Sequence, residues 1–327
     1  MCSVDIGIDP ESQLTHWGEF RDALNATGHP IYYSICPHSV VPHPDGPGGW
    51  WWTRGRNGTE PNTYAPPIVW TANQRRRLAN SLLVEFTNLF DMWYSPHWLA
   101  PHNCPGPKCN TSSPGGFLTN VDAMAEMTKP EYSGPGSWAD GDMLQVCNYG
   151  EGGIHAGGSL GQGMTLREYA ASLSIWAALA SPIIISADVR TLRERHPECL
   201  DMLLNATAVL EVSQDPLGRP GHLVHQATNG SATSAPTTTN IVEQIWAREL
   251  AGKRLAVVFF NRDESARTMT FERDMYRGDM DLAGPCSAHD AWRHRDIDEG
   301  NNACYDAKIT VNVAKHEARV IILSPKS

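Results

Sequence analysis

The stretch "GPGSWADGDML", from Gly134 to Leu144, holds more chemistry than a turn requires. Three glycines and a proline surround a tryptophan and two carboxylates, and the chain then returns to apolar residues. Asp140 and Asp142 can close such a loop with side-chain hydrogen bonds. The same carboxylates, together with Trp138, can also contact a bound ligand. The sequence therefore predicts a loop with either a structural or a binding role.

Helix and strand patterns alternate on both sides of this stretch. Apolar spacing predicts a helix over residues 10–28, followed by a parallel strand in "PIYYSIC" (30–36). Thr165 and Glu168 form a capping-box pattern that opens a second helix. The predicted apolar face of this helix consists of Leu166, Tyr169, Leu173, Trp176 and Ala180. Pro182 ends the helix, and "IIIS" (183–186) predicts another buried strand that ends at Asp188.

The pattern changes to strands alone in the last third of the chain. The predicted strands are "IVEQIWA" (241–247), "LAVVFFN" (255–261), "RTMTF" (267–271), "KITVNV" (308–313) and "ARVIILS" (318–324). Alternating helices and strands followed by strands alone indicate an α/β domain and then a small antiparallel β domain. The change falls between Leu217 and Asn240, and we expect domains at residues 1–220 and 221–327.

Composition excludes two classes of partner. The 327 residues carry a formal charge of −10 without a basic stripe, so we expect no nucleic-acid partner. The uncharged run from Tyr169 to Ala187 is long enough to suggest a membrane span. Its serines, Pro182 and the change from helical to strand composition argue against a span. We therefore expect no membrane partner.

Eight cysteines and five Asn-X-Ser/Thr sequons favour a glycoprotein of the secretory pathway; the sequons begin at Asn25, Asn57, Asn110, Asn205 and Asn229. The opening "MCSVDIGIDPES" has no signal-peptide pattern, and we interpret the chain as lacking its natural beginning. Cys104 with Cys109, and Cys286 with Cys304, can each close a disulfide. No cysteine or histidine set has the spacing of a zinc site, so we predict no metal.

Several segments match known motifs in the same order along the chain. Residues 134–144 are similar to GPGxWNDPDML, and "ALNATGHPIYYSIC" (23–36) is similar to ALNxTGRPIxYSxC. "WAALASPIIISADV" (176–189) is similar to WAxxxAPLxxxxDL, and "VSQDPLGRPG" (212–221) to VNQDxLGxQG. "AWRHRDI" (291–297) and "VAKHEARVIILSP" (313–325) match two closing motifs. Together these segments resemble the melibiase-type α-galactosidases, glycoside hydrolase family 27.

The resemblance implies a fold and an activity. It implies an α/β fold in which about the second half of a (β/α)8 TIM barrel precedes a C-terminal antiparallel β-sandwich. The implied reaction is cleavage of terminal α-galactosides with retained configuration, which needs two carboxyl groups and no cofactor. The implied partner is a carbohydrate substrate, with a missing N-terminal half or a homodimer as further partners. The implied location is extracellular, lysosomal or vacuolar.

The catalytic positions depart from the family pattern. Alignment of the family's K-x-D-x-C motif on Cys2 places the nucleophile before Met1, so it is absent from this chain. In "LVEFTNLFDMW" (83–93) the acid/base position falls on Asn88, whose amide has no dissociable proton. Glu85 and Asp91 are possible substitutes, although a solvated Glu beside a structural Asp is the alternative. Asp5 and Asp9 lie beyond the strand end, which disfavours them as nucleophiles.

The substrate-binding residues implied by the resemblance and by aromatic composition are Trp51, Trp138, Asp140, Asp142 and Met143. We expect an α-galactosidase-like hydrolase that is inactive as this chain. The alternative is a non-catalytic sugar-binding remnant.

Overall fold

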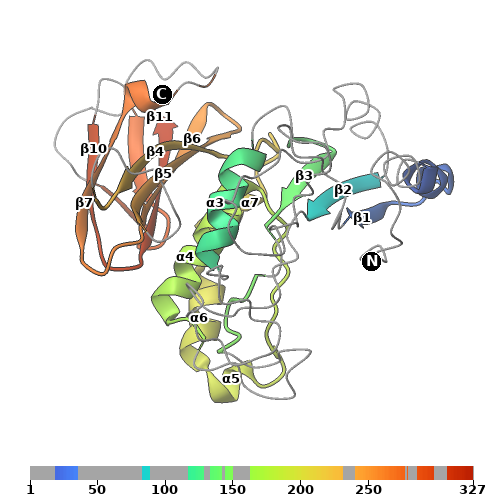
Figure 1. Ribbon diagram of the computed structural model, residues 1–327, viewed down its shortest axis with the longest axis horizontal. Coiled ribbons are helices and arrows are strands. Elements are labelled where there is room, and N and C mark those ends of the chain that lie inside the picture. Colours follow the sequence, from blue (N-terminus) through green and yellow to red (C-terminus); the bar gives the residue numbers. More distant parts are fainter. Residues whose placement is uncertain are drawn as a thin grey trace, which may run out of the picture.

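The computed structural model describes residues 19–35, 83–88, 117–128, 133–141, 144–149, 163–230, 240–276, 278, 286–297 and 308–326. Figure 1 shows three groups of elements: a small parallel sheet, a set of helices and a set of antiparallel strands. The helices lie between the two sets of strands in this view. The order along the chain agrees with the predicted change from alternating helices and strands to strands alone.

Three strands form a parallel sheet in chain order. They are β1 (Ile31–Ile35), β2 (Leu83–Asn88) and β3 (Ser137–Asp140). The predicted parallel strand in "PIYYSIC" is confirmed as β1. Tyr33 is buried whereas the adjacent Tyr32 is 79% exposed, as expected for neighbouring side chains on opposite faces of a strand. The predicted preceding helix is described from residue 19 and is helical through residue 26.

The position of β3 corrects one prediction. The stretch from Gly134 to Leu144 was expected to be a loop, yet four of its residues form a strand. Ser137 to Asp140 pair with Glu85 to Asn88 of β2 in continuous parallel register. Local composition favours a turn here, but the hydrogen-bonding partners come from a strand some 50 residues earlier in the chain. A distant backbone ladder therefore overrides the local signal.

Helix α4 (Leu166–Leu179) begins where the capping box predicts. The Thr165 N–H donates to Glu168 Oε2 at 2.6 Å, and the Glu168 N–H donates to Thr165 Oγ1 at 3.3 Å. The predicted apolar side chains Tyr169, Leu173 and Trp176 are buried. Leu166 is 37% exposed, which corrects its prediction as part of the buried face; it lies between Thr165 and Arg167, which are also exposed.

The predicted buried strand at "IIIS" is wrong. Among the described residues, Ile185 makes one isolated parallel bridge, to Leu144, and Ser186 N donates to the Leu144 carbonyl at 3.1 Å. Ile184 is 75% exposed. A strand needs a continuous ladder of partners, and an apolar run alone does not supply one.

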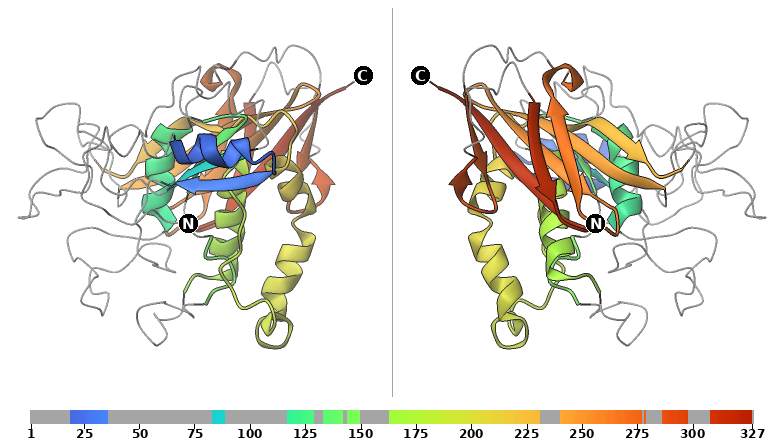
Figure 2. Two further views of the ribbon diagram at one scale, coloured as in Figure 1. Left: turned by 90° about the vertical axis from the view of Figure 1, so that its right-hand side faces the viewer. Right: turned by 90° about the vertical axis from the view of Figure 1, so that its left-hand side faces the viewer.

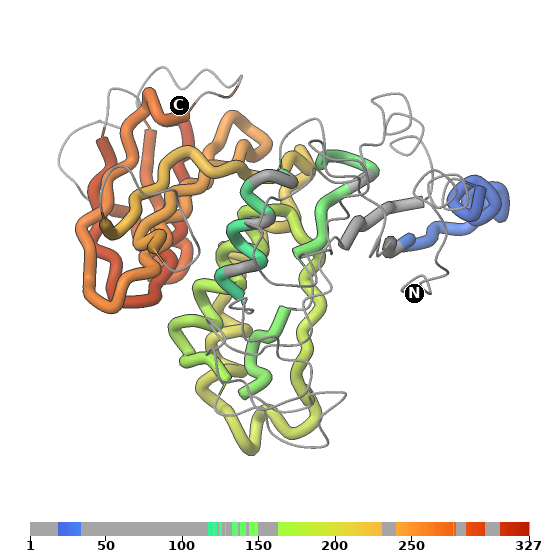
Figure 3. The backbone as a smooth tube through the Cα atoms, viewed as in Figure 1, coloured from blue at the N-terminus to red at the C-terminus, as the bar shows by residue number. Residues whose placement is uncertain are grey.

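Three short helices follow: α5 (Leu192–Arg195), α6 (Pro197–Asn205) and α7 (Thr207–Ser213). Pro197 stands at the first position of α6, where its missing N–H costs nothing. Helix α3 (Phe117–Met127) lies earlier in the chain, between β2 and β3. Figure 3 traces the chain from α7 through residues 214–221 into the first antiparallel strand.

Eight strands make up the antiparallel part. A six-stranded sheet has the order β4-β5-β6-β11-β8-β9, and a two-stranded sheet pairs β10 with β7. The bounds are β4 His222–Thr228, β5 Ile241–Leu250, β6 Arg254–Asn261, β7 Arg267–Glu272, β8 Cys286–Asp290, β9 Arg295–Asp296, β10 Lys308–Val313 and β11 Ala318–Pro325. The five predicted strands are confirmed, and β4, β8 and β9 were not predicted.

The six-stranded sheet is covered on both faces (Figure 2). On β6, Ala256, Val258 and Phe260 join the core that includes α3 and α4. The alternate residues Leu255, Val257 and Phe259 join a second core against β7 and β10. Because successive strand side chains point to opposite faces, both sets are buried, and this explains the uninterrupted apolar run in the sequence.

No helix among the described residues is long and apolar enough to cross a membrane. The same residues contain no group of three or more His, Cys, Asp or Glu side chains placed to hold a metal ion.

Candidate functional site

The polar residues singled out in the sequence lie where the parallel strands end. The register pairs Ile35 with Thr87 and Asn88 with Asp140. The carboxyl ends of β1, β2 and β3 therefore meet at one edge of the sheet. Ligands of α/β folds bind at such edges, since the following loops emerge there. We call this the carboxyl edge and treat it as the candidate site.

The structure brings some predicted residues together and separates others. Asn88 and Asp140 are paired neighbours at the carboxyl edge. Glu85 is paired with Ser137, three residues back along β2. The remaining predicted site residues, Trp51, Asp91, Asp142 and Met143, lie outside the described residues.

Gly141 follows Asp140 and fastens the carboxyl edge to two helices. Its N–H donates to Ser181 Oγ at 2.7 Å, just beyond α4, and its carbonyl accepts from Asn120 Nδ2 on α3 at 2.8 Å. A Cβ at Gly141 would lie 2.7 Å from Trp176 Cζ2. This position therefore admits only glycine without movement of the tryptophan ring.

Replacing Gly141 with alanine is expected to lower the free energy of unfolding by about 1–3 kcal/mol, because the added methyl overpacks against Trp176. Chemical denaturation measures the loss. The matched control is Gly134→Ala in the same stretch, where a Cβ meets nothing within 4 Å. Equal effects of the two substitutions would show that the contact with Trp176 does not constrain the site.

Trp138 ties β3 to the "QDPLG" segment. Its indole N–H donates to the Gly218 carbonyl at 2.8 Å, and the side chain is half-buried. Gly218 has φ +63°, and a Cβ there would lie 3.3 Å from Pro135 Cγ and 3.4 Å from Trp138 Cζ2. The N–H of Trp138 is thus hydrogen-bonded within the protein.

Asp215 holds this segment in place. The sequence analysis did not identify it as a site residue, although it lies within the matched motif at residues 212–221. Its buried carboxylate accepts from Leu217 N–H at 3.0 Å and from Ala251 N–H at 2.9 Å. Arg254 Nη2 donates to it at 3.2 Å. Ala251 lies in the turn between β5 and β6, and Arg254 is the first residue of β6, so the antiparallel part supports the loop that positions Trp138.

Arg248 makes a second connection between the two parts. Its guanidinium donates to the carbonyls of Ala177 and Ser213, the latter at 3.2 Å. Burial lowers the pKa of Arg248 to about 10, partly offset by the charge of Asp215. The side chain therefore stays protonated at neutral pH inside the junction.

A disulfide fastens the segment that follows the carboxyl edge. Cys147 is bonded to Cys199 of α6, a pairing the sequence did not predict. Next to it, the Tyr149 ring stacks on His196 with ring centroids 3.7 Å apart, and its hydroxyl donates to Glu198 at 2.9 Å. Burial, with the adjacent Glu198 carboxylate, raises the pKa of Tyr149.

The predicted disulfides involve residues that are only partly described. Cys286 is disulfide-bonded. Its expected partner Cys304 lies outside the described residues, as do Cys104 and Cys109.

Comparisons with known proteins define first a class and then a family. Residues 118–215 match the family model described as "Alpha galactosidase A", and residues 243–323 match "Alpha galactosidase C-terminal beta sandwich domain". These matches, on a parallel α/β part followed by antiparallel sheets, define a glycoside hydrolase class of protein. The chain belongs to the melibiase-type α-galactosidases, glycoside hydrolase family 27.

The chain is also similar in sequence to individual curated proteins. The chain is 27% identical over 323 residues to alpha-galactosidase 3 of Arabidopsis thaliana, covering 99% of this chain and 54% of the relative. It is 24% identical to human alpha-N-acetylgalactosaminidase, covering 77% of this chain and 44% of that protein. The chain spans about half the length of these curated relatives.

A solved α-galactosidase structure from Saccharomyces cerevisiae supports the same fold. It superposes with a TM-score of 0.61 at 19% identity, covering 98% of this chain and 69% of that one.

Proposed function

We propose that the chain carries the carbohydrate-binding edge of an α-galactosidase-like retaining glycoside hydrolase, that it binds terminal α-galactosides, and that it does not cleave them by itself. In this proposal β1, β2 and β3 are consecutive strands of a (β/α)8 barrel that occupies residues 1–220. Residues 221–327 form the β-sandwich domain. The observation that carries the proposal is the pairing of Asn88 with Asp140 at the carboxyl edge.

The expected lack of cleavage follows from the chemistry of position 88. A retaining glycosidase uses two carboxyl groups about 5 Å apart, one of which protonates the leaving oxygen. Asn88 aligns with that acid in the family motif, and an amide cannot donate a dissociable proton. This residue supports the alternative of a non-catalytic sugar-binding member.

Glu85 is a poor substitute for the acid. It stands three residues before the carboxyl edge, which is about 10 Å along an extended strand. This displacement of Glu85 from the carboxyl edge, about 10 Å, is larger than the separation of about 5 Å between the two carboxyl groups of a retaining glycosidase. Asp91 remains the proposed substitute, should one exist.

We assign the sugar contacts by the chemical character of each side chain. Asp140 supplies a carboxylate acceptor for sugar hydroxyls at the carboxyl edge. Trp138 supplies an apolar ring face, since its N–H is bonded to Gly218. Trp51, Asp142 and Met143 stay proposed contacts on the strength of the resemblance.

We also propose a location in the secretory pathway, extracellular, lysosomal or vacuolar. The sequon residues Asn25, Asn205 and Asn229 are all exposed in the structure. The Cys147–Cys199 disulfide supports an oxidising compartment.

Binding of methyl α-galactoside, measured by isothermal titration calorimetry, tests the proposal. We expect the folded chain to bind it in preference to methyl α-glucoside, which differs only at the 4-hydroxyl. Asp140→Asn is expected to weaken binding about tenfold, because a hydrogen bond to a charged acceptor is lost. The matched control is Asp201→Asn, an exposed carboxylate on α6. A folded chain that binds neither sugar, or binds equally after Asp140→Asn, would contradict the proposal.

A further inference from the structure

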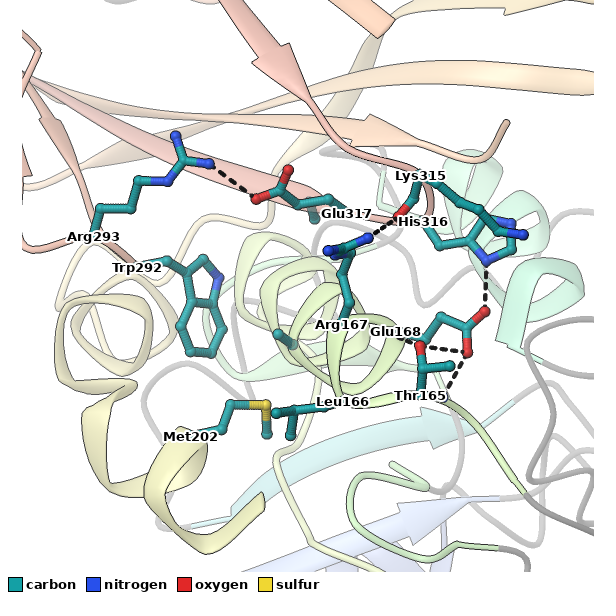
Figure 4. Close-up of a pocket in the computed structure, with 12 residues that line it drawn as sticks. Thr165, Leu166, Arg167, Glu168, Met202, Trp292, Arg293, Lys315, His316 and Glu317 are labelled. Atoms are coloured by element: carbon teal, nitrogen blue, oxygen red, sulfur yellow. Dashed lines mark hydrogen bonds and ion pairs between the residues drawn. The ribbon is translucent and has the colours of Figure 1, made fainter. Parts of the chain in front are cut away.

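The turn between β10 and β11 rests against the first turn of α4. Figure 4 shows Lys315, His316 and Glu317 of this turn above the N-cap residue Thr165 and above Arg167 and Glu168 of the helix. The two segments are nearly 150 residues apart in the chain. The contact therefore joins the antiparallel part to the helix that follows the carboxyl edge.

His316 lies between two carboxylates from different elements. Its Nδ1 is 2.6 Å from Glu168 Oε1, and its Nε2 is 3.1 Å from Glu264 Oε1. The His316 side chain is 12% exposed, and Glu168 is buried. Glu264 follows β6, so three separate segments of the chain meet at this imidazole.

The geometry distinguishes the two charge states of the ring. A neutral imidazole carries one N–H, so one of its nitrogens would face a carboxylate oxygen with no proton between them. An imidazolium donates from both nitrogens at once and places its positive charge between two negative ones. Only the protonated ring therefore satisfies both contacts.

The surrounding charges leave Glu168 dependent on this ring. Lys315 Nζ pairs with Glu264, and Arg167 Nη1 donates to the Lys315 carbonyl at 3.3 Å. Glu317 accepts from Ala314 N–H at 2.6 Å and from Arg293 Nη2 at 3.3 Å, so it is engaged on the other side of the turn. Within the described part of the chain, His316 is the basic side chain that contacts Glu168.

The pKa of Glu168 is lowered, as expected for a carboxylate that accepts a hydrogen bond from His316. Burial works to raise its pKa, but the hydrogen bonds from His316 and Thr165 outweigh burial and hold the pKa below the ordinary value. The carboxylate form is thus favoured in the folded protein. The stability that the Glu168 carboxylate contributes is therefore fully present above the ordinary pKa of a glutamate, and it is lost as the pH falls through the lowered pKa of Glu168.

We propose that His316 is a proton-operated clasp between the β10–β11 turn and the start of α4. The protonated ring fastens the turn to the capping box of α4, and loss of the proton loosens it. The clasp is closed while both ring nitrogens carry a proton and opens when the ring becomes neutral, because a neutral imidazole cannot donate to both carboxylates. This proposal does not depend on sugar binding.

Hydrogen exchange of the first turn of α4 in the 327-residue chain tests the clasp. After correction for the intrinsic pH dependence of exchange, we expect opening of this turn to be about tenfold more frequent at pH 8 than at pH 5.5. The buried strand β6 should keep the same protection at both pH values. Unchanged protection of the first turn between the two pH values would overturn the proposal.

Variants separate the clasp from ordinary packing. His316→Gln should remove most of the pH dependence by making the first turn as open at pH 5.5 as the unaltered chain is at pH 8. Glu264→Gln keeps the ring and should reduce the dependence, because only one carboxylate remains. The matched control is His289→Gln, a half-exposed ring that contacts the single carboxylate of Asp296 at 2.9 Å. If His316→Gln and Glu264→Gln both left the pH dependence intact, the clasp would be excluded.

Discussion

Replacing Arg262 with methionine is expected to lower the free energy of unfolding by about 3–5 kcal/mol, which is a large share of a domain's stability. Arg262 follows β6 and forms a two-pronged ion pair with Asp122 of α3, in which Nη2 donates to Oδ2 at 3.1 Å. The two side chains are 0% and 9% exposed. Removal of the arginine strands a buried carboxylate.

The neighbouring Gln244 amide donates a hydrogen bond to Asp122 but cannot replace the positive charge of Arg262. Gln244 Nε2 donates to Asp122 Oδ1 at 3.1 Å and to Gln226 Oε1 at 2.9 Å. This cluster joins α3 to the six-stranded sheet, so the variant should also loosen the contact between the two parts. Chemical denaturation monitored by tryptophan fluorescence measures the change.

Two controls test whether the buried charge is the cause. The double variant Asp122→Leu/Arg262→Met removes both partners and should lose less stability than Arg262→Met alone. Lys308→Met breaks an exposed pair with Glu272 and should cost less than about 1 kcal/mol. A double variant less stable than the single one would contradict this explanation.

The double variant Cys147→Ser/Cys199→Ser is expected to lose about 4 kcal/mol of stability. The two cysteines are 52 residues apart, and a cross-link that closes a loop of this length constrains the unfolded chain by about that amount. Thermal unfolding of the variant measures the loss. Both cysteines are buried, so each serine also adds a small polar cost.

A second cysteine change separates the cross-link from packing. Cys147→Ala/Cys199→Ala avoids the buried hydroxyls and should still lose most of the same free energy. Stability equal to that of the unaltered chain in either double variant would show that the Cys147–Cys199 bond does not constrain the segment after the carboxyl edge.

Local signals in the sequence identified the elements that local forces determine. The capping box at Thr165 and Glu168 involves four adjacent residues, and the structure contains both of its hydrogen bonds. The sandwich strands were recognised because uninterrupted apolar runs such as residues 255–260 are buried on two faces. The family resemblance, carried by ordered motifs, was confirmed by the two matched models.

The features that the sequence did not reveal depend on distant partners. β3 forms because β2 offers a ladder, although glycines and aspartates around Trp138 favour a turn. The isoleucines at 183–185 have apolar strand composition, but within the described part of the chain they make a single bridge, from Ile185 to Leu144. Asp215 and Cys147 act through residues far along the chain, so neither composition nor spacing marks them. At the candidate site, the sequence motifs identified Asn88 and Asp140 separately. The structure shows in addition that the two residues are paired neighbours on adjacent strands.

Turnover of p-nitrophenyl α-galactoside by the purified chain, shown to be folded by circular dichroism, tests the central claim most directly. We expect no release of p-nitrophenol above the background, because the proposal places Asn88, which has no dissociable proton, at the acid/base position. Clear turnover by the folded chain, lost on mutation of Glu85 or Asp91, would show that another carboxyl group supplies the proton. That result would contradict the assignment of the acid/base position and of the chain as a sugar-binding, non-cleaving protein.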